Sequence, residues 1–216
     1  MGKKSPVKST SCLPGHQSSP LTMPPLPKNW PPHLPYHPLP VRSKELTPRQ
    51  VEALTQKRPD DPFLAADQTP IPSPLVKIVP IKDPNHPACG QHGLFATRQL
   101  KPGSYILLYV GTVHASAGLD LGDSDYDLWL DRDAGLAVDA AKGGNEARFI
   151  NDYRGVGERP NAEFREVWSQ RAGQRCMAVF VLPAGSATAK SAPARRGIAK
   201  GQEILVSYGK GFWGHR

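Results

Sequence analysis

Prolines divide the chain into two parts of very different character. Of the 24 prolines in 216 residues, 19 lie in residues 1–84 and 5 lie in residues 85–216. Proline fixes φ and has no amide N–H, so a segment this rich in proline forms neither long helices nor central strands. We therefore expect residues 1–74 to be largely disordered and residues 75–213 to form one domain with a modest hydrophobic core.

Two segments within the Pro-rich region carry predictions of their own. Residues 24–40 contain overlapping P-x-x-P spacings, which favour a polyproline helix and could bind an SH3- or WW-type module. A semi-rigid tether explains the same composition, and we favour that interpretation. Residues 47–57 predict a short helix, with Thr47 as its N-cap, Pro48 in its first turn and Pro59 just after its end.

The pattern changes after residue 74 to short apolar runs broken by glycine and proline. Runs of this length, rich in β-branched and aromatic residues, are typical of strands, and no alternation with helices accompanies them. The predicted strands are residues 74–81, 93–97, 104–111, 126–130, 135–139, 161–168, 176–182 and 203–209. The sequence therefore predicts a mostly β domain, interrupted by a flexible insertion loop at residues 183–200.

Composition argues against several functional classes. No apolar run approaches the 18 residues of a membrane span, so no membrane association is expected. The three cysteines, Cys12, Cys89 and Cys176, show no CxxC spacing, and no histidine pairs with a second ligand at metal spacing. We therefore expect neither a disulfide framework nor a metal site. No phosphate-binding P-loop and no nucleophile-elbow motif occurs.

Charge is concentrated in two segments of opposite sign. The net charge is +8, yet residues 120–139 hold seven aspartates and one arginine, whereas residues 184–200 hold four basic residues and no acidic one. An acidic patch on a basic chain could bind a basic substrate, although a solvated, turn-rich loop explains the same composition. The basic segment has no aromatic residues on which bases could stack, so direct nucleic-acid binding is not expected.

Four motif segments follow one another along the second part of the chain. They are GQHGLFATRQLKPG (90–103), YVG (109–111), DAAKGGNEARFINDYRGVGERPNAEF (139–164) and KGQEILVSYGKGFW (200–213). Within them, GLFA resembles the first cofactor motif of the SET domain, the fold of most protein lysine methyltransferases. GNEARFIND is similar to that family's GN-x-ARF-x-NH motif, RPNAEF to its PN segment and GQEILVSYG to its GEE-[LI]-x-x-x-YG signature. The resemblance covers residues 75–213.

This resemblance implies both a fold and a function. The fold would be of the SET type, with several small sheets and a knot-like threading of the C-terminal segment that brings Asn151 beside Tyr208. The function would be S-adenosylmethionine-dependent protein lysine N-methylation of a histone tail or another basic protein, in the nucleus or alternatively in the cytoplasm. The rival interpretation is a catalytically inactive SET-like interaction module that acts as an adaptor through its Pro-rich tail.

Tyr208 is the residue that we expect to be central to catalysis, with Tyr126 as the second catalytic candidate. A lysine amine must be neutral to attack a methyl group, and its unperturbed pKa is about 10.4. A narrow, dry channel lined by tyrosines disfavours the ammonium form and orients the amine. The resemblance implies a donor site formed by Gln91, His92, Gly93, Leu94, Arg148, Asn151, Asp152, Tyr208, Phe212 and Trp213. The predicted substrate-binding residues are Tyr109, Tyr126, Asp127, Leu128 and Trp129.

Two departures from the family pattern bear on donor binding. The family's histidine after the asparagine is Asp152 here, which preserves binding if the contact is made through the backbone. In the first Gly-x-Gly motif Gln91 stands in the first position, so Gly93 alone is kept, unless Gly90 takes that role with a shift of one residue. Glycine at such a position lets the backbone approach a ligand closely.

Overall fold

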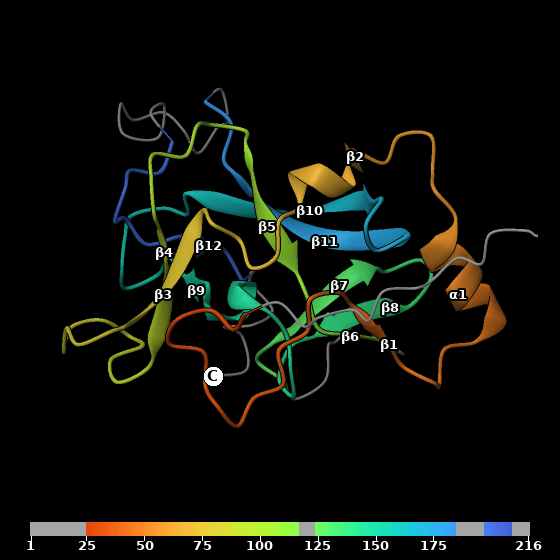
Figure 1. The fold of residues 1–216 in the computed structure, drawn as a ribbon, viewed down its shortest axis with the longest axis horizontal. Helices are drawn as coiled ribbons and strands as arrows, with labels where there is room; N and C mark the ends of the chain where they lie inside the picture. The colour runs from red at the N-terminus through yellow and green to blue at the C-terminus, as the bar shows by residue number, and fades with distance from the viewer. Residues whose placement is uncertain (1–24, 117–123, 185–196, 209–216) are drawn as a thin grey trace, which may run out of the picture.

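β-Strands dominate the structure, a computed structural model that describes residues 25–116, 124–184 and 197–208 (Figure 1). The strands are β1 (Val41–Arg42), β2 (Phe63–Leu64), β3 (Val76–Pro80), β4 (His92–Ala96), β5 (Tyr105–Tyr109), β6 (Thr112–Ala115), β7 (Asp127–Asp131), β8 (Leu136–Asp139), β9 (Asn151–Asp152), β10 (Ala162–Ser169), β11 (Gln174–Val181) and β12 (Leu205–Val206). The helical elements are α1 (Pro48–Thr55) and two 3-10 turns, η1 (Ala66–Gln68) and η2 (Glu146–Phe149).

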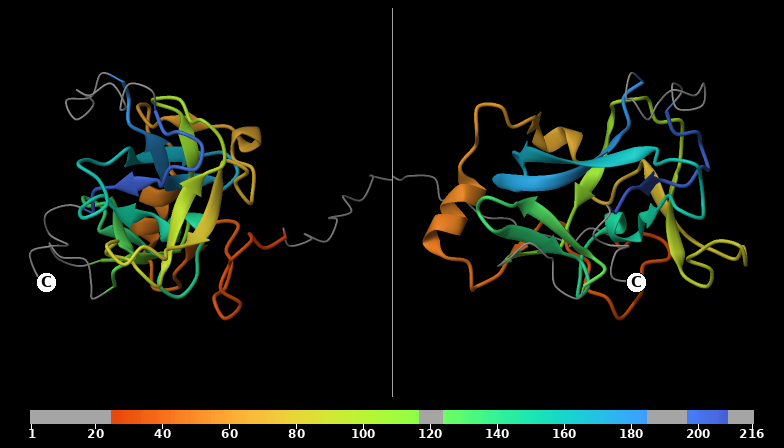
Figure 2. Two further views of the ribbon diagram at one scale, coloured as in Figure 1. Left: turned by 90° about the vertical axis from the view of Figure 1, so that its left-hand side faces the viewer. Right: turned by 180° about the vertical axis from the view of Figure 1, so that it is seen from behind.

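Four small sheets make up the fold. One four-stranded sheet has the order β1-β6-β8-β7 and the second has the order β2-β10-β11-β5, while β3 pairs with β4 and β12 pairs with β9. Helix α1 lies at one end of the molecule and the β3–β4 pair at the other (Figures 1 and 2). This arrangement confirms the predicted mostly β fold of several small sheets.

Each of the eight predicted strands overlaps an observed one, with ends shifted by a few residues. The strand predicted at residues 203–209 contains the two-residue β12, and residue 209 lies outside the described residues. Four further short strands, β1, β2, β6 and β9, were not predicted. They are too short for an alternation of apolar residues to show, and they exist because a neighbouring strand supplies the hydrogen bonds.

Helix α1 confirms the helix predicted within residues 47–57. Oγ1 of Thr47 accepts the N–H of Gln50 at 3.3 Å, and the Gln50 side chain accepts the N–H of Thr47 at 3.1 Å, a reciprocal capping box. Leu54 is fully buried in the core. The Gln50 amide also donates to the carbonyl of Gly135, so the helix is tied to the turn between β7 and β8.

Residues 25–43 differ most from the expectation of disorder, because they pack along the folded domain. Trp30 and Tyr36 are buried with their rings edge to face, 5.0 Å apart between centroids. Tyr36 forms a parallel bridge with Gly144, and β1 pairs with β6. Proline enforces an extended backbone, and an extended backbone can be added to a sheet edge wherever aromatic side chains anchor it.

Residues before the boundary predicted between residues 74 and 75 therefore also pack onto the folded domain. The stretch that holds the P-x-x-P spacings of residues 32–38 is anchored in the fold by Tyr36, so we do not treat it as a free ligand for another module. The described residues begin at residue 25, and the prediction of disorder for residues 1–24 concerns residues outside them.

The C-terminal segment passes between two separate parts of the chain. The N–H of Ile204 donates to a carbonyl of β4 at 2.8 Å, whereas Leu205 pairs with β9. The side chain of Asn161 spans the same segment, because its Nδ2 donates to the carbonyl of Glu203 at 2.7 Å and its Oδ1 accepts the N–H of Leu205 at 2.9 Å. This is the threading that the family resemblance implies.

The last residues of the insertion loop predicted at residues 183–200 pack against the core. Residues 185–196 lie outside the described residues. Ile198, by contrast, is fully buried and exchanges two backbone hydrogen bonds with Leu100, at 2.8 and 3.0 Å. The end of the predicted loop is thus fixed to the core before the chain enters β12.

Candidate functional site

Tyr208 follows β12 directly and lies against β9. Its hydroxyl donates to the carbonyl of Ile150 at 2.5 Å, and its N–H donates to Oδ2 of Asp152 at 2.7 Å. Burial raises the pKa of Tyr208 above its usual range, and the negative charge of Asp152 adds to the effect. The hydroxyl therefore stays protonated at neutral pH and orients its neighbours rather than acting as a base.

Asp152, which stands where the family pattern has histidine, is buried beside Tyr208. Its side chain is 4% exposed. Besides the N–H of Tyr208, the carboxylate accepts the backbone N–H of Arg154 at 2.8 Å and the Arg154 guanidinium at 2.8 Å. The carboxylate is thus used to hold Tyr208 and the turn after β9, and an arginine balances its charge.

Glu203 is a buried residue of the site that the sequence analysis did not single out. Its Oε1 accepts Nδ2 of Asn151 at 2.8 Å, and its Oε2 lies 3.1 Å from Nε2 of His86. A Cβ added to Gly93 would lie 2.5 Å from Oε1. Three separate parts of the chain meet at this carboxylate. The signal in the sequence was an acidic residue directly before the apolar run of β12.

The predicted donor residues of the first motif have different surroundings. Leu94 is fully buried in the core, so its side chain is not available to a ligand and its backbone alone could contact one. The His92 ring lies edge-on to Phe149, with 5.8 Å between ring centroids. Gln91 is exposed. Gly90 has a φ of +84°, the left-handed conformation that glycine adopts readily, so it shapes the turn before β4.

Tyr109 and Tyr126 lie next to one another, and each interacts electrostatically with Tyr208. The Tyr109 hydroxyl donates to the carbonyl of Tyr126 at 2.7 Å, and burial raises the pKa of Tyr109 well above its usual range. The guanidinium of Arg148 lies 4.3 Å from the centroid of the Tyr126 ring, and its Nε donates to the carbonyl of Ala140 at 3.0 Å. The structure therefore brings three predicted tyrosines and one cation together.

The sequence that forms these elements matches a known family over more than half of the chain. The family model of the SET domain matches residues 91–209. This chain belongs to the SET-domain family. No curated protein sequence matches the chain.

Solved structures resemble this SET domain over part of their length. The ctPRC2 complex in an autoinhibited conformation bound to S-adenosylmethionine is 22% identical, with a TM-score of 0.44, and a humanized mutant of the Chaetomium thermophilum Polycomb Repressive Complex 2 is 21% identical, with a TM-score of 0.43. Each match covers 62% of this chain and 15% of the other. KRYPTONITE in complex with mCHH DNA, an H3(1-15) peptide and SAH is 20% identical, with a TM-score of 0.42, and the match covers 62% of this chain and 23% of that one.

The predicted substrate residues of the SET domain lie on β7. The side chain of Asp127 is 3% exposed, and its Oδ1 is 3.0 Å from Nε2 of His114, so this carboxylate is engaged inside the fold rather than free for a basic substrate. Leu128 packs against the core. Trp129 is half-buried and lies under the guanidinium of Arg132, 5.6 Å from the ring centroid.

Three aspartates of the acidic stretch, Asp127, Asp131 and Asp139, are engaged by groups inside the fold. Besides Asp127, Asp131 is buried and bonds to Arg175 at 2.5 Å and to Arg58. Asp139 accepts hydrogen bonds from a neighbouring serine hydroxyl at 2.7 Å and a backbone N–H at 2.9 Å. These three carboxylates are therefore held by hydrogen bonds or ion pairs within the fold.

Several predicted features cannot be placed on the described residues or are not found in them. Phe212 and Trp213, predicted at the donor site, lie outside the described residues. Within the part of the chain that the structure describes, no cluster of three or more His, Cys, Asp or Glu could hold a metal ion. The helices of that same part are too short or too polar to cross a membrane.

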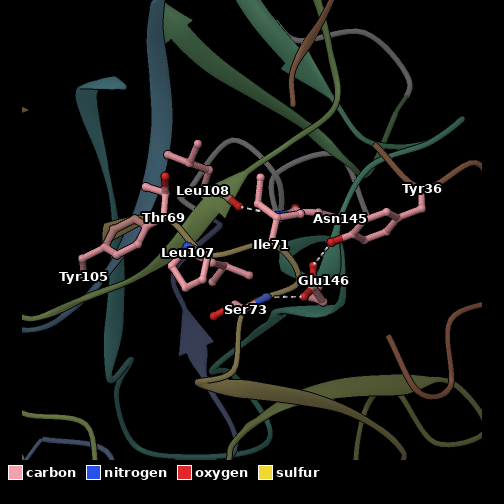
Figure 3. A pocket seen from close by; sticks show the side chains of 10 residues that line it. Tyr36, Thr69, Ile71, Ser73, Tyr105, Leu107, Leu108, Asn145 and Glu146 are labelled. Atoms are coloured by element: carbon pink, nitrogen blue, oxygen red, sulfur yellow. Dashed lines mark hydrogen bonds between the residues drawn. The ribbon is translucent and has the colours of Figure 1, made fainter. Parts of the chain in front are cut away.

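A small internal cavity of about 20 Å³ lies beside η2, apart from the predicted site (Figure 3). Glu146 is buried there, and it accepts the Tyr36 hydroxyl at 3.1 Å and the N–H of Ser73 at 2.8 Å. None of the predicted site residues lines the cavity. Its polar groups bond to one another, and they tie the Pro-rich segment to η2.

Proposed function

We propose that this chain is an S-adenosylmethionine-dependent protein lysine N-methyltransferase. The observation that carries the proposal is the pairing of the Tyr208 hydroxyl with the Ile150 carbonyl, 2.5 Å apart, beside Tyr109 and Tyr126. Membership of the SET-domain family supports it, because the SET domain is the fold of most protein lysine methyltransferases.

The residues around Asn151 fit a methyl donor that carries an ammonium group and a sulfonium. Asn151 uses its Nδ2 to bond to Glu203 and to the carbonyl of His92, so its Oδ1 remains for an ammonium. Gly93 keeps the backbone of β4 free of a side chain at the same place. Asp152 does not add an unbalanced charge, since Arg154 pairs with it. When bound, the donor supplies an electrophilic methyl group.

The side chains of this chain would then prepare the substrate amine. The Tyr208 hydroxyl is protonated and held by the Ile150 carbonyl, so the two oxygens present a fixed polar edge that orients the amine. The buried ring of Tyr109 and the half-buried ring of Tyr126 limit the access of water. Exclusion of water and the positive charge of Arg148 both disfavour an ammonium, so the lysine enters as the neutral amine.

The substrate class that we propose is a basic protein such as a histone tail, and the location is the nucleus. Both follow from the family rather than from the acidic stretch, because Asp127 and Asp131 are paired inside the fold. Fluorescence of a tagged copy in cells would test the location, and exclusion from the nucleus would contradict it.

Transfer of labelled methyl from S-adenosylmethionine to core histones and to whole-cell extract tests the function. We expect label on lysine, and a rate at least tenfold lower for Tyr208→Phe because orientation of the amine is lost. Tyr105→Phe is the matched control, since Tyr105 lines the separate cavity and its loss should leave the rate unchanged. Failure of the wild type both to transfer methyl and to bind the donor would overturn the proposal.

A further inference from the structure

We propose that His86 and Glu203 form a positioning pair that sets the orientation of the Asn151 amide toward the methyl donor. The inference rests on the proposed function for the identity of the ligand. The orientation itself follows from the contacts of the three side chains. His86 lies outside all four motif segments of the sequence.

The amide orientation of Asn151 is determined by its neighbours. Nδ2 is 2.8 Å from Oε1 of Glu203 and 3.3 Å from the carbonyl oxygen of His92. Both partners are acceptors without a proton to donate, so the amide oxygen cannot take the place of the NH₂ group. Oδ1 therefore points away from both, and within the described residues it accepts no hydrogen bond. It is left as an acceptor for a cationic group such as an ammonium.

His86 holds the other oxygen of Glu203 in a defined tautomer. Its Nδ1 accepts the N–H of Ala88 at 3.0 Å, so the proton of the neutral ring is on Nε2. Nε2 is 3.1 Å from Oε2 of Glu203 and donates to it. The side chains of His86 and Glu203 are 10% and 8% exposed, so water competes little for this bond.

Close packing leaves Glu203 little freedom to find other partners. Its Oε1 lies where a Cβ on Gly93 would be, and the Nδ2 of Asn161 holds its backbone carbonyl at 2.7 Å. Each oxygen of the Glu203 carboxylate is bonded to a separate donor. A movement of one donor therefore shifts the carboxylate and, with it, the other donor. Loss of the His86 bond would let Glu203 turn, and Asn151 would lose the contact that orients its amide.

Two substitutions of His86 separate this role from a purely structural one. His86→Gln places an amide NH₂ near the position of Nε2 and keeps the donor to Glu203, whereas His86→Asn places an acceptor near the position of Nδ1 and keeps only the bond to Ala88. Glu203→Gln has one acceptor oxygen, so it cannot accept from both His86 and Asn151. Gln202→Ala is the matched control, because Gln202 is exposed and adjacent, and its side chain contacts Ala199 instead.

Affinity for S-adenosylmethionine and S-adenosylhomocysteine would be measured by titration calorimetry, with kcat and KM on the substrate identified by the labelling experiment. We expect His86→Gln and Gln202→Ala to bind within about twofold of wild type, and His86→Asn and Glu203→Gln to bind about tenfold more weakly. The loss should be in the donor KM with a smaller change in kcat. Equal affinity of the two His86 variants, or weaker binding by His86→Gln alone, would overturn the positioning role.

Two further readouts keep the test decisive. Nitrogen NMR of the unliganded wild type should show His86 protonated on Nε2, and protonation on Nδ1 would overturn the inference even if a variant failed to fold. If the wild type does not bind the donor, both the proposed function and this inference are wrong. If the wild type binds the donor and the folded variants bind it equally well, the positioning role of His86 and Glu203 is wrong and the proposed function stands.

Discussion

A buried network of charges lies near the end of the molecule that carries α1. The guanidinium of Arg175, fully buried in β11, bonds to Asp131 at 2.5 Å and to Glu166, and Arg58 bonds to Asp131 as well. Asp61 lies 3.7 Å from Nε of Arg175. Every charge of this network has an opposite charge within 4 Å.

The network around Glu203 is built from other groups and leaves one of them open. Its carboxylate contacts His86 and Asn151, and the neighbouring Tyr208 donates to the backbone of Ile150. Here Asn151 retains an amide oxygen that accepts no hydrogen bond within the described residues. The two networks differ in kind: the first pairs opposite charges, although in the part of the chain that the structure describes the buried Nε of Arg175 has no hydrogen bond and only Asp61 at 3.7 Å, whereas the open atom of the second is an acceptor that a ligand could use.

The largest effect that this comparison predicts is on stability, at the charged network. Arg175→Met leaves Asp131 buried with less compensation, so we expect a loss of about 3–5 kcal/mol in the free energy of unfolding. Urea denaturation measures it, and donor affinity of the folded variant should be unchanged. Arg165→Met is the control, because Arg165 pairs with Glu163 at the surface and its loss should cost about 0.5 kcal/mol. Weakened donor binding in Arg175→Met would break the distinction between the two networks.

For Tyr208 we expect the opposite result, a large loss of methyl transfer with a small loss of stability. Tyr208→Phe removes the hydroxyl that bonds to Ile150, so methyl transfer should fall at least tenfold while the free energy of unfolding falls by about 1 kcal/mol. Parallel rate and denaturation measurements test this. A loss of stability as large as that of Arg175→Met, with full activity at a temperature where the variant is folded, would contradict the proposed role of the Tyr208 hydroxyl in methyl transfer.

Gly93→Ala tests whether donor binding depends on the position of the Glu203 carboxylate. The new Cβ would lie 2.5 Å from Oε1 of Glu203, so the carboxylate must move and donor affinity should fall about tenfold. Titration calorimetry measures the change. Gly157→Ala is the control, since the nearest atoms to its Cβ are at 3.7 and 3.8 Å, an ordinary contact distance. Equal affinity of the two variants would show that Glu203 can move without consequence.

A smaller, pH-dependent effect is expected at His114. Burial lowers its pKa, but the hydrogen bonds to Asp127 and to the Ala115 carbonyl and the negative charges of Asp127 and Asp139 together outweigh burial and raise the pKa. The stabilisation is therefore fully present below the unfolded pKa, near 6.5, and is lost as pH rises through the raised folded value. His114→Ala should cost about 0.5–1 kcal/mol at pH 5.5 and less at pH 9, by urea denaturation. A loss that grows with pH would contradict this sign, and exposed His33→Ala is the control.

The smallest effect concerns two cysteines, one close to each network in sequence. Cys176 follows Arg175 and is buried, and burial raises the pKa of its thiol to about 12, whereas Cys89 is exposed in the loop that carries His86. Thiol labelling at pH 8, read by peptide mass spectrometry, should modify Cys89 and leave Cys176 untouched until the protein unfolds. Labelling of both cysteines at equal rates would show that the charged network opens as readily as the loop.

The sequence by itself determined the features that depend on near neighbours along the chain. The eight strands could be predicted because apolar runs and their glycine and proline boundaries are local, and Thr47 followed by Pro48 marked the start of α1. The order of the four motif segments identified the family. Tyr208 and Tyr109 could be named from those motifs and Tyr126 from the acidic stretch, and in the structure the Tyr109 hydroxyl bonds to the carbonyl of Tyr126.

The tertiary structure decided what distant residues do to one another. Proline content limits local backbone conformation but says nothing of packing, so residues 25–43 could be placed on the domain only by their contacts with Gly144 and β6. Asp131 finds Arg175 at a separation of 44 residues, which turns an apparent acidic patch into a buried ion pair. His86 meets Glu203 at a separation of 117 residues. No local pattern encodes such a pair, because it exists only where the threaded segment brings the two side chains together.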